Sequence, residues 1–542
     1  MVLAEHKHSD GTLARLPSFQ DNFQQTWKDR LPVLPNETGH IWQVECDSPQ
    51  LVDFCRWLTQ ELEFVFATLI VDERADGGWS LLYLFYRDDK SPWVCVDLKL
   101  DPGTAAVPSL VGLPHGPSFD WHEREAEDLF GVHFEGHPRL GEFILHEDWP
   151  EGVNPMRRDF DARPRFEPKA PEPKWVPPTV VMAPGSFSMP IGPVFSDFAE
   201  SAHFLLETVG EDVIRTIPRF FYKYRGLEKI SEGQSADRAL LLAERFSGIA
   251  AFAHGLAFCE ALESICGTEV PSRAQALRTV FAELERLRSH AAAITGICNS
   301  TALAVATSQA ALIEEDLLRL SCQITAHRYL FGLLVPGGVT CDLSLADRQQ
   351  LDTAVAAIAK RLLRLLEMLR YSSSFLDRLE EVGMVTEDKA RAYGLVGPIA
   401  RASGVARDIR KLFPYAGYRT IEFAVPVEQE GDGYARMRIL FAEAEQSAFI
   451  IRNTLSGLPD GPACTELVQP REGAALAAVE APFGAAFHWL RIDDHGRVVR
   501  YRVTPPSFTN WHGFHLAAEN FAFQDFPIIL ASFGLSNAEC DR

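Results

Sequence analysis

The stretch ERFSGIAAFAH, residues 244–254, sets a few polar side chains among small and apolar ones. Ser247 and His254 are the members whose types suit chemistry. A histidine titrates near neutral pH, so His254 could donate a proton beside a cavity. The alternative is that neighbours in an ordinary core satisfy both of its ring nitrogens.

Two further groups of charged side chains could relay protons or orient the wall of a cavity. They are Glu228 with Lys229, and Glu283, Glu285 and Arg286 with His290. The alternative is that these groups are solvated or paired for structural reasons alone.

Five arginines could hold a partner subunit or an anionic cofactor, or could instead form ion pairs between domains. They are Arg273, Arg278, Arg401, Arg407 and Arg410. The acidic run HEREAEDLF, residues 122–130, is expected to be a helix face that docks a neighbouring subunit. A metal site is less favoured there, because the carboxylates do not all converge on one face.

The ten cysteines are scattered, and no two of them form a Cys-x-x-Cys. This argues against a zinc ribbon or a local iron–sulfur loop. In a cytosolic chain such cysteines are predicted to be small buried hydrophobes. No Gly-x-Gly-x-x-Gly opens a helix, so no direct NAD site is expected.

The 542 residues favour two or more domains, and the formal net charge is −22. Such acidity argues against nucleic acid as a partner and against a polybasic patch for a membrane surface. No run of eighteen apolar residues occurs, and the N-terminus lacks the apolar segment of a signal peptide. We therefore expect a soluble or peripheral protein of the cytoplasm.

The pattern of elements changes along the chain. Strand-like runs cover residues 63–73, 79–88 and 93–101. Seven prolines then fall within residues 164–184, which predicts an extended linker because proline fixes φ and removes a backbone donor. Residues 272–294 and 345–371 are predicted to be long helices. Short strand-like runs return after about residue 480, for example at 498–506.

Residues 121–160 carry a dense series of motifs. They are Glu123-Arg124-Glu125, Asp128-Leu129-Phe130-Gly131, Gly136-His137-Pro138, Trp149 and Pro155-Met156-Arg157-Arg158-Asp159. In this order they resemble the signature of the 30-kilodalton-type subunit of NADH–quinone oxidoreductase, respiratory complex I.

The chain after the proline-rich stretch resembles the 49-kilodalton-type subunit of complex I and the large subunit of group 4 membrane-bound nickel–iron hydrogenases. The motifs are YRGLEK (224–229), VPSRAQALRTVFAELERLRSH (270–290), PGGVTCDL (336–343), GPIARASGVARDIRK (397–411), LPDGP (458–462) and EAPFG (480–484). A fusion of the two subunit types is the arrangement of formate-hydrogenlyase-type hydrogenases and of some complex I enzymes.

The departures from these families fall on the reactive positions. Where the hydrogenases hold nickel with four cysteines, the resemblance places Ser247, Ala250, Leu535 and Ala538. Serine is a poor substitute for a soft thiolate, and alanine and leucine supply no donor. Cys540 alone cannot rebuild the site, so the resemblance implies no metal on this chain.

The residues that bind quinone in complex I are altered as well. Its tyrosine and histidine positions fall on Gly248 and Ala199. Two-point recognition of a quinone needs donors at fixed places, so both contacts are in doubt. Tyr224, Ser247 and His254 are the polar groups left for a relocated grip.

The resemblance implies an α+β fold: a small α/β-sandwich-like domain at 1–160, a proline-rich linker at 161–185, and a mainly helical domain with peripheral β-hairpins at 186–542. The candidate cavity residues are Tyr224, Glu228, Ser247, Gly248, His254, Arg273 and His290.

The expected function is a peripheral-arm subunit on the cytoplasmic face of the inner membrane, without a bound cofactor of its own and with quinone as the candidate ligand. Its expected partners are a small subunit of the 20-kilodalton type, which carries an iron–sulfur cluster, and membrane-arm subunits. The alternatives are a true quinone-reductase subunit with a relocated grip, a hydrogenase proper, and a non-catalytic assembly or regulatory protein.

Overall fold

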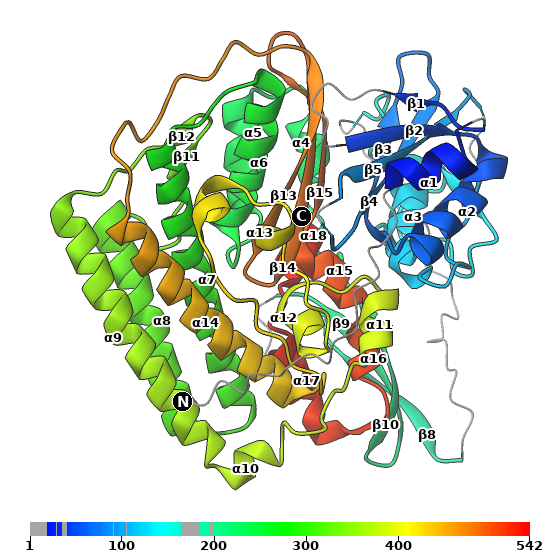
Figure 1. Cartoon of the computed structure of the whole chain (residues 1–542). Helices are drawn as coiled ribbons and strands as arrows, with labels where there is room; N and C mark the ends of the chain where they lie inside the picture. Colours follow the sequence, from blue (N-terminus) through cyan, green and yellow to red (C-terminus); the bar gives the residue numbers. More distant parts are fainter. Residues whose placement is uncertain are drawn as a thin grey trace.

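The computed structural model describes residues 19–28, 30–34, 41–89, 91–103, 106–161, 163, 184–194 and 200–542. A region built on one β-sheet, blue to cyan in Figure 1, packs against a larger and mainly helical region. This confirms the predicted α+β class. The predicted linker at 161–185 and Ala199 lie almost wholly outside the described residues, so the domain boundaries stay predictions.

The N-terminal sheet has five strands in the order β1-β2-β5-β4-β3. Strands β2 and β5 pair in parallel and the other neighbours are antiparallel. The bounds are β1 (Val33–Leu34), β2 (Ile41–Cys46), β3 (Val65–Glu73), β4 (Trp79–Tyr86) and β5 (Trp93–Leu100). The three predicted strands are therefore β3, β4 and β5.

Helix α3 (Pro117–Phe130) packs on β3 and ends at Gly131, whose φ of 78° is a left-handed conformation that suits glycine. Three of its acidic side chains, Asp120, Glu123 and Glu125, are buried, and the last two belong to the acidic run at 122–130. Glu123 accepts a hydrogen bond from Leu110 N (2.8 Å), and Glu125 accepts one from Arg502 (2.6 Å). The prediction that this helix face docks a neighbouring subunit is therefore wrong for Glu123 and Glu125, because both bind groups of their own chain.

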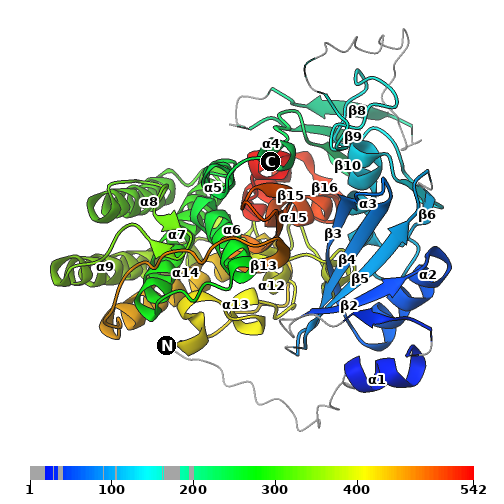
Figure 2. The ribbon, with the colours of Figure 1, turned by 90° about the horizontal axis from the view of Figure 1, so that it is seen from above.

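The centre of the large region is α7 (Ser272–Ser300), most of whose residues are buried. It packs against α8 (Ala304–Thr325) and α14 (Gly433–Ser456), and α9 (Leu345–Arg370) lies against α8 and α14. Figure 2 shows α8 and α9 at the edge of this region. A capping box between Ser344 and Asp347 starts α9. The two predicted long helices are α7 and α9.

A three-stranded antiparallel sheet stands between the helices and the N-terminal region (Figure 1). It consists of β13 (Gly473–Ala481), β14 (Gly484–Ile492) and β15 (Val498–Thr504), with α6 (Ala251–Cys266) against β13 and β14. Thr504 Oγ1 lies 2.7 Å from Thr68 Oγ1 of β3, and Arg491 pairs with Asp72 at 2.8 Å. Polar contacts thus join the two regions.

The peripheral β-structure includes the four-stranded sheet β16-β10-β9-β8 and the hairpin β11-β12.

Within the described parts of the chain, no helix combines the length and apolar character that crossing a membrane requires. The remaining elements are α1 (Phe19–Thr26), α2 (Ser48–Arg56), η1 (Trp57–Glu61), β6 (Ala106–Pro108), β7 (His133–Glu135), β8 (Ser186–Ile191), β9 (His203–Val209), β10 (Asp212–Arg219), α4 (Leu227–Ser231), α5 (Ala236–Arg245), β11 (Leu334–Val335), β12 (Gly338–Val339), α10 (Ser373–Leu376), α11 (Glu387–Ala392), α12 (Gly397–Ala402), α13 (Ile409–Leu412), η2 (Ala416–Thr420), α15 (Pro506–His512), α16 (Phe514–Ala517), β16 (Phe521–Ala522), η3 (Phe523–Asp525), α17 (Phe526–Phe533) and α18 (Asn537–Asp541).

Candidate functional site

The loop 247–250 joins α5 to α6 and is held by side chains of α7. Ser289 Oγ donates to Ile249 O (2.6 Å), and Arg288 Nη2 donates to Gly248 O (2.9 Å). Ser247 is buried, whereas Gly248 is exposed and a side chain added there would meet open space. Two neighbouring candidate residues therefore face different surroundings.

Glu285 fixes the start of α6 from the same face of α7. Its carboxylate accepts hydrogen bonds from the N–H groups of Phe252 (2.7 Å) and Ala253 (2.9 Å). A helix leaves these first donors without intrahelical partners. Burial raises the pKa of Glu285 to about 7, against the lowering effect of Arg288 and of the two N–H groups. The group that positions the loop therefore titrates near neutral pH.

Helix α18 brings Glu539 against the loop. Ser247 Oγ donates to Glu539 Oε1 (3.2 Å), and His254 Nε2 lies 3.0 Å from the same oxygen. Ser507 N donates to Glu539 Oε2 (3.1 Å). The resemblance places Leu535 and Ala538 at the C-terminal pair of ligand positions. The residue of α18 that contacts Ser247 is Glu539, one position after Ala538.

His254 continues into a line of buried titratable groups. Its Nδ1 lies 3.0 Å from His488 Nε2, and His488 Nδ1 lies 2.7 Å from the Tyr501 hydroxyl. Burial, with His254 alongside, holds the pKa of His488 well below its ordinary value. Burial raises the pKa of Tyr501. Both ring nitrogens of His254 are thus satisfied, as in the core interpretation, but their partners are themselves able to carry protons.

Glu228 and Tyr224 belong to the junction between the two regions. Glu228 Oε1 accepts hydrogen bonds from Arg502 and Arg542, each at 3.3 Å. The same two arginines donate to Glu125 of α3. The buried hydroxyl oxygen of Tyr224 has no hydrogen-bond partner among the described residues, and burial raises its pKa. Tyr224 therefore offers a free donor at this junction.

Arg273 lies near the opposite end of α7 from His290. Its Nε donates to Asp342 (2.9 Å) and its Nη1 to Pro459 O (2.9 Å). It precedes Glu285 by twelve positions on the helix, or about 18 Å along the axis. The structure therefore does not bring Arg273 together with Ser247 and His254.

All five arginines considered as clamps bind acceptors within their own chain. The pairs are Arg273–Asp342, Arg278–Glu263, Arg401 with Glu443 and Glu480, Arg407–Asp88, and Arg410 with Asp408 and Glu283. Of these, the Arg407–Asp88 pair joins the N-terminal region to the large region. The contacts support the interpretation of these arginines as ion pairs.

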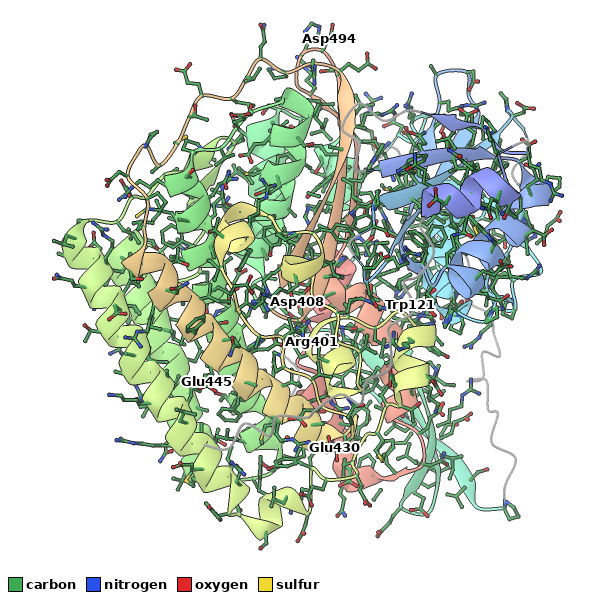
Figure 3. All side chains as sticks on the ribbon, viewed as in Figure 1. Trp121, Arg401, Asp408, Glu430, Glu445 and Asp494 are labelled. Atoms are coloured by element: carbon green, nitrogen blue, oxygen red, sulfur yellow. The ribbon has the colours of Figure 1, made fainter. Side chains whose placement is uncertain are left out.

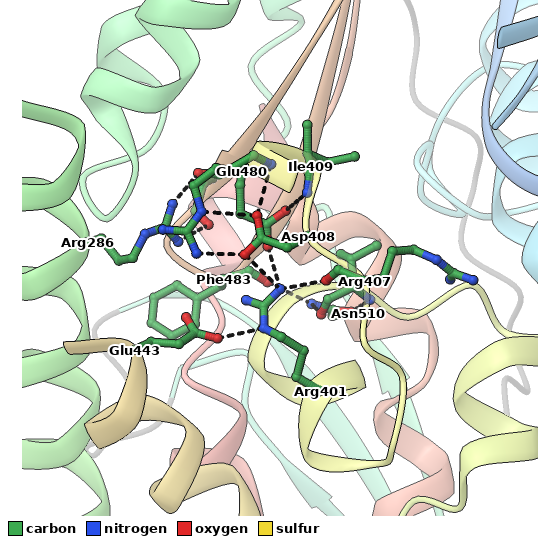
Figure 4. Close-up of polar contacts among 12 residues, drawn as sticks. Arg286, Arg401, Arg407, Asp408, Ile409, Glu443, Glu480, Phe483 and Asn510 are labelled. Carbon is green, nitrogen blue, oxygen red and sulfur yellow. Dashed lines mark hydrogen bonds and ion pairs between the residues drawn. The ribbon is translucent and has the colours of Figure 1, made fainter. Parts of the chain in front are cut away.

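His290 borders a buried group of charged side chains, which we call the carboxylate–arginine cluster. Figure 4 labels its members Arg286, Arg401, Asp408, Glu443 and Glu480. Its members are Glu283, Arg286, Arg401, Asp408, Arg410, Glu443 and Glu480. Arg401 donates to Glu443 (2.6 Å) and to Glu480 (2.8 Å), and His290 Nε2 lies 2.9 Å from Glu443. Figure 3 places Arg401 and Asp408 in the middle of the molecule. The cluster thus ties α7, α14, β13 and the α12–α13 segment together.

The cluster holds four carboxyl groups against three guanidinium groups. Burial alone would raise the pKa of Glu283, Asp408 and Glu443, but the surrounding arginines outweigh it and hold each pKa below its usual range. Burial, reinforced by Asp408, raises the pKa of Glu480. Burial also lowers the pKa of His290. Glu480 is therefore the cluster carboxyl with the raised proton affinity.

The donor set at the loop does not fit a nickel–iron group, which needs soft thiolate ligands. Ser247 is bonded to Glu539, Ala250 has no donor atom, and burial raises the pKa of the Cys540 thiol in α18. Among the described residues, no group of three or more His, Cys, Asp or Glu is arranged to hold a metal ion.

Seven of the ten cysteines are buried as predicted, but Cys322 and Cys464 are exposed and Cys341 is half-buried.

Two hollows lie elsewhere on the molecule. One, of about 300 Å³, runs between α9 and α14 and is lined by apolar side chains of both helices, such as Leu362 and Phe441, and by charged side chains, such as Arg438 and Glu445. The other, of about 10 Å³ beside Glu285 and Arg288, is close to the size of a single water. Glu285, which the sequence suggested as a group of a cavity wall, lines the smaller hollow. The seven candidate cavity residues line neither hollow: Tyr224, Glu228, Ser247, Gly248, His254, Arg273 and His290.

Sequence reasoning missed Glu539, His488, Tyr501 and Glu443. The partners of His254 lie 234 and 285 positions away in the chain. The one local sequence feature that could have pointed to His488 was the motif EAPFG, which contains Glu480 and ends four residues before His488. No local spacing connects either residue to the loop at 247–250.

Comparisons with known proteins cover most of the chain. Residues 44–166 match the family model of the respiratory-chain NADH dehydrogenase 30 Kd subunit, and residues 305–471 and 462–542 match that of the 49 Kd subunit. Residues 225–293 match the model of nickel-dependent hydrogenase.

Three curated relatives align along nearly the whole chain. Formate hydrogenlyase subunit 5 of Escherichia coli (strain K12) is 29% identical over 93% of this chain and 90% of its own length. Hydrogenase-4 component G of the same strain is 28% identical over 87% and 82%. The C/D subunit of NADH-quinone oxidoreductase from Acinetobacter baumannii (strain AYE) is 26% identical over 93% and 92%. The chain therefore joins in one polypeptide a region similar to the 30 Kd subunit and a region similar to the 49 Kd subunit of respiratory-chain NADH dehydrogenase, with a segment between them similar to nickel-dependent hydrogenases.

Proposed function

We propose that this chain is a peripheral-arm subunit of a membrane-associated oxidoreductase of the complex I or hydrogenase-4 type. The support is similarity along nearly the whole chain to relatives whose names describe them as subunits or components of such enzymes. In this assembly the chain lies on the cytoplasmic face of the inner membrane. It docks against an iron–sulfur small subunit of the 20-kilodalton type and beside membrane-arm subunits, and any NADH is oxidised elsewhere.

The chain shapes a cavity next to the partner's cluster and holds no metal centre of its own. One observation carries this part of the proposal. The position of a metal-ligating loop is taken by Ser247, and its hydroxyl and His254 are both satisfied by the carboxylate of Glu539. A carboxylate–imidazole–hydroxyl set is hard and protonatable, whereas nickel in this family is held by soft sulfur.

Purification of the tagged chain from native membranes tests the proposal. We expect an iron–sulfur small subunit and membrane-arm subunits to co-purify, with iron and acid-labile sulfide in the complex. The chain isolated from that complex should then carry neither nickel nor iron in stoichiometric amount. Recovery of the chain alone would contradict the assembly, and stoichiometric nickel on the isolated chain would contradict the metal-free site.

A true quinone-reductase subunit with a relocated grip is the second candidate. The unpartnered Tyr224 hydroxyl favours it, since a buried hydroxyl normally finds a hydrogen-bond partner and a quinone carbonyl is a suitable acceptor. We expect Tyr224→Phe to raise the KM for quinone about tenfold in the purified complex if that hydroxyl binds the carbonyl. An unchanged KM would remove Tyr224 from the quinone site.

A further inference from the structure

Glu539, His254, His488 and Tyr501 form an unbroken line of titratable side chains, with successive contacts of 3.0, 3.0 and 2.7 Å. All four side chains are fully buried. We propose that they are a proton relay, in which one proton taken up at the Tyr501 end appears on Glu539 and both histidines change tautomer. The inference concerns the chain by itself and does not require the assembly proposed above.

The charge on Glu539 is the first reason. Among the described residues His254 is its one ion-pair partner, and no arginine or lysine contacts it. Glu443 is equally buried but is bonded to Arg401. An ionised carboxylate buried without a cation is costly, so a mobile proton is the means of neutralising Glu539.

The hydrogen-bond geometry allows two complete proton arrangements. In the first, the Tyr501 hydroxyl donates to His488 Nδ1, His488 Nε2–H donates to His254 Nδ1, and His254 Nε2–H donates to the ionised Glu539. In the second, every bond runs the other way, from protonated Glu539 to the Tyr501 oxygen. A neutral imidazole has one donor and one acceptor nitrogen, so each arrangement satisfies every link.

The two arrangements differ by one proton. The proton on His254 Nε2 moves to Glu539 Oε1 and forms an O–H bond. The proton on His488 Nε2 then moves to His254 Nδ1, and the Tyr501 proton moves to His488 Nδ1. One proton entering the line at the Tyr501 end restores the Tyr501 hydroxyl. No electron is transferred, and all four groups end neutral.

The surroundings fit this transfer. Burial keeps the pKa of His488 well below its ordinary value, so its imidazole stays neutral and can pass a proton on. Glu228 and Cys259 are the titratable groups whose charge acts on Tyr501. Beside Glu539 stand the Ser247 hydroxyl, the Ser507 N–H and the Cys540 thiol. The relay therefore runs from the side of Glu228 to the Ser247 loop.

Histidine-selective ¹⁵N labelling of the full chain tests the relay, because ring nitrogen shifts distinguish the two tautomers and the imidazolium. We expect the His254 and His488 signals to change tautomer together, with one midpoint, as the pH is varied over the range in which the protein stays folded. Glu539→Gln, which keeps the shape but does not titrate, should abolish the change. Separate midpoints, or tautomers that stay fixed over this range, would overturn the proposal.

Tyr501→Phe tests transmission along the line. It removes the hydroxyl at one end, and we expect the tautomer ratio of His254, two contacts away, to shift by at least about tenfold. Tyr83→Phe is the matched control, since Tyr83 is also fully buried and its hydroxyl has no hydrogen-bond partner among the described residues. A change confined to His488 would show a local structural role and defeat the relay. If a variant does not fold, the wild-type titration decides alone.

Discussion

Glu285 shows how one side chain can couple protonation to the shape of the loop. Its carboxylate caps α6 through Phe252 N and Ala253 N, directly behind the loop that carries Ser247. Burial raises its pKa to about 7. In an unfolded chain a glutamate titrates near pH 4.3, so the folded state binds this proton more tightly.

The sign of the pH dependence follows from that difference. The stabilising contribution of the Glu285 proton is complete below about pH 4.3 and is lost as the pH rises to about 7. Over this range the wild type should lose roughly 3 kcal/mol of unfolding free energy relative to Glu285→Gln. Urea unfolding followed by circular dichroism at a series of pH values measures this difference. Glu422→Gln, at a fully exposed side chain, is the control, and a difference that stays constant with pH would refute the prediction.

At the scale of elements, the carboxylate–arginine cluster fastens four segments that are distant in sequence. Arg401 joins Glu443 of α14 to Glu480 of β13, and Arg410 joins Glu283 of α7 to Asp408. Desolvating these charges is expensive, so the cluster adds little net stability as a whole. Removing one member is different, because it leaves its partners buried and uncompensated.

Arg401→Met should therefore destabilise the chain by about 3–5 kcal/mol. Arg452→Met is the matched control on α14, since Arg452 forms a half-exposed pair with Asp352 of α9. Exposed pairs contribute about 1 kcal/mol or less, so this variant should unfold almost like the wild type. Denaturant unfolding of both proteins distinguishes the two cases. If both variants lost the same unfolding free energy, the cluster would not contribute to stability in this way.

At the scale of the whole molecule, the two regions are interlocked by buried charge. Glu125 of the N-terminal region binds Arg502 and Arg542, and Glu228 of the large region binds the same arginines. The polar contacts between β3 and the C-terminal sheet lie at the same junction. The two regions should therefore unfold together.

Glu125→Gln should uncouple them, because it removes the charge that the two arginines share across the junction. We expect about 3–5 kcal/mol of lost stability and a split into two unfolding transitions. Hydrogen exchange should increase in α3 and β15. Glu45→Gln, which breaks the partly exposed pair with Lys99 within the N-terminal sheet, should preserve a single transition. A single transition in Glu125→Gln would mean that apolar packing alone couples the regions.

The candidate site was predictable only in part. Ser247 and His254 do share one buried site, but Gly248 faces outward beside them. The other four candidates are dispersed. Tyr224 and Glu228 lie at the junction between regions, His290 borders the cluster, and Arg273 stands about 18 Å along α7 from Glu285. The motifs assigned these candidate residues to one family pattern, but a motif does not show which residues are in contact.

The sequence by itself determined the local elements and the resemblance to complex I and hydrogenase subunits. Alternating runs specified β3, β4 and β5, and helical periodicity specified α7 and α9, because each pattern depends on residues close together in the chain. Only the tertiary structure decided what meets His254. Its partners arrive on β14 and α18, from 234 and 285 positions away, and the inward turn of α18 selects Glu539 over Ala538. Such contacts depend on how distant surfaces pack, and periodicity carries no record of that.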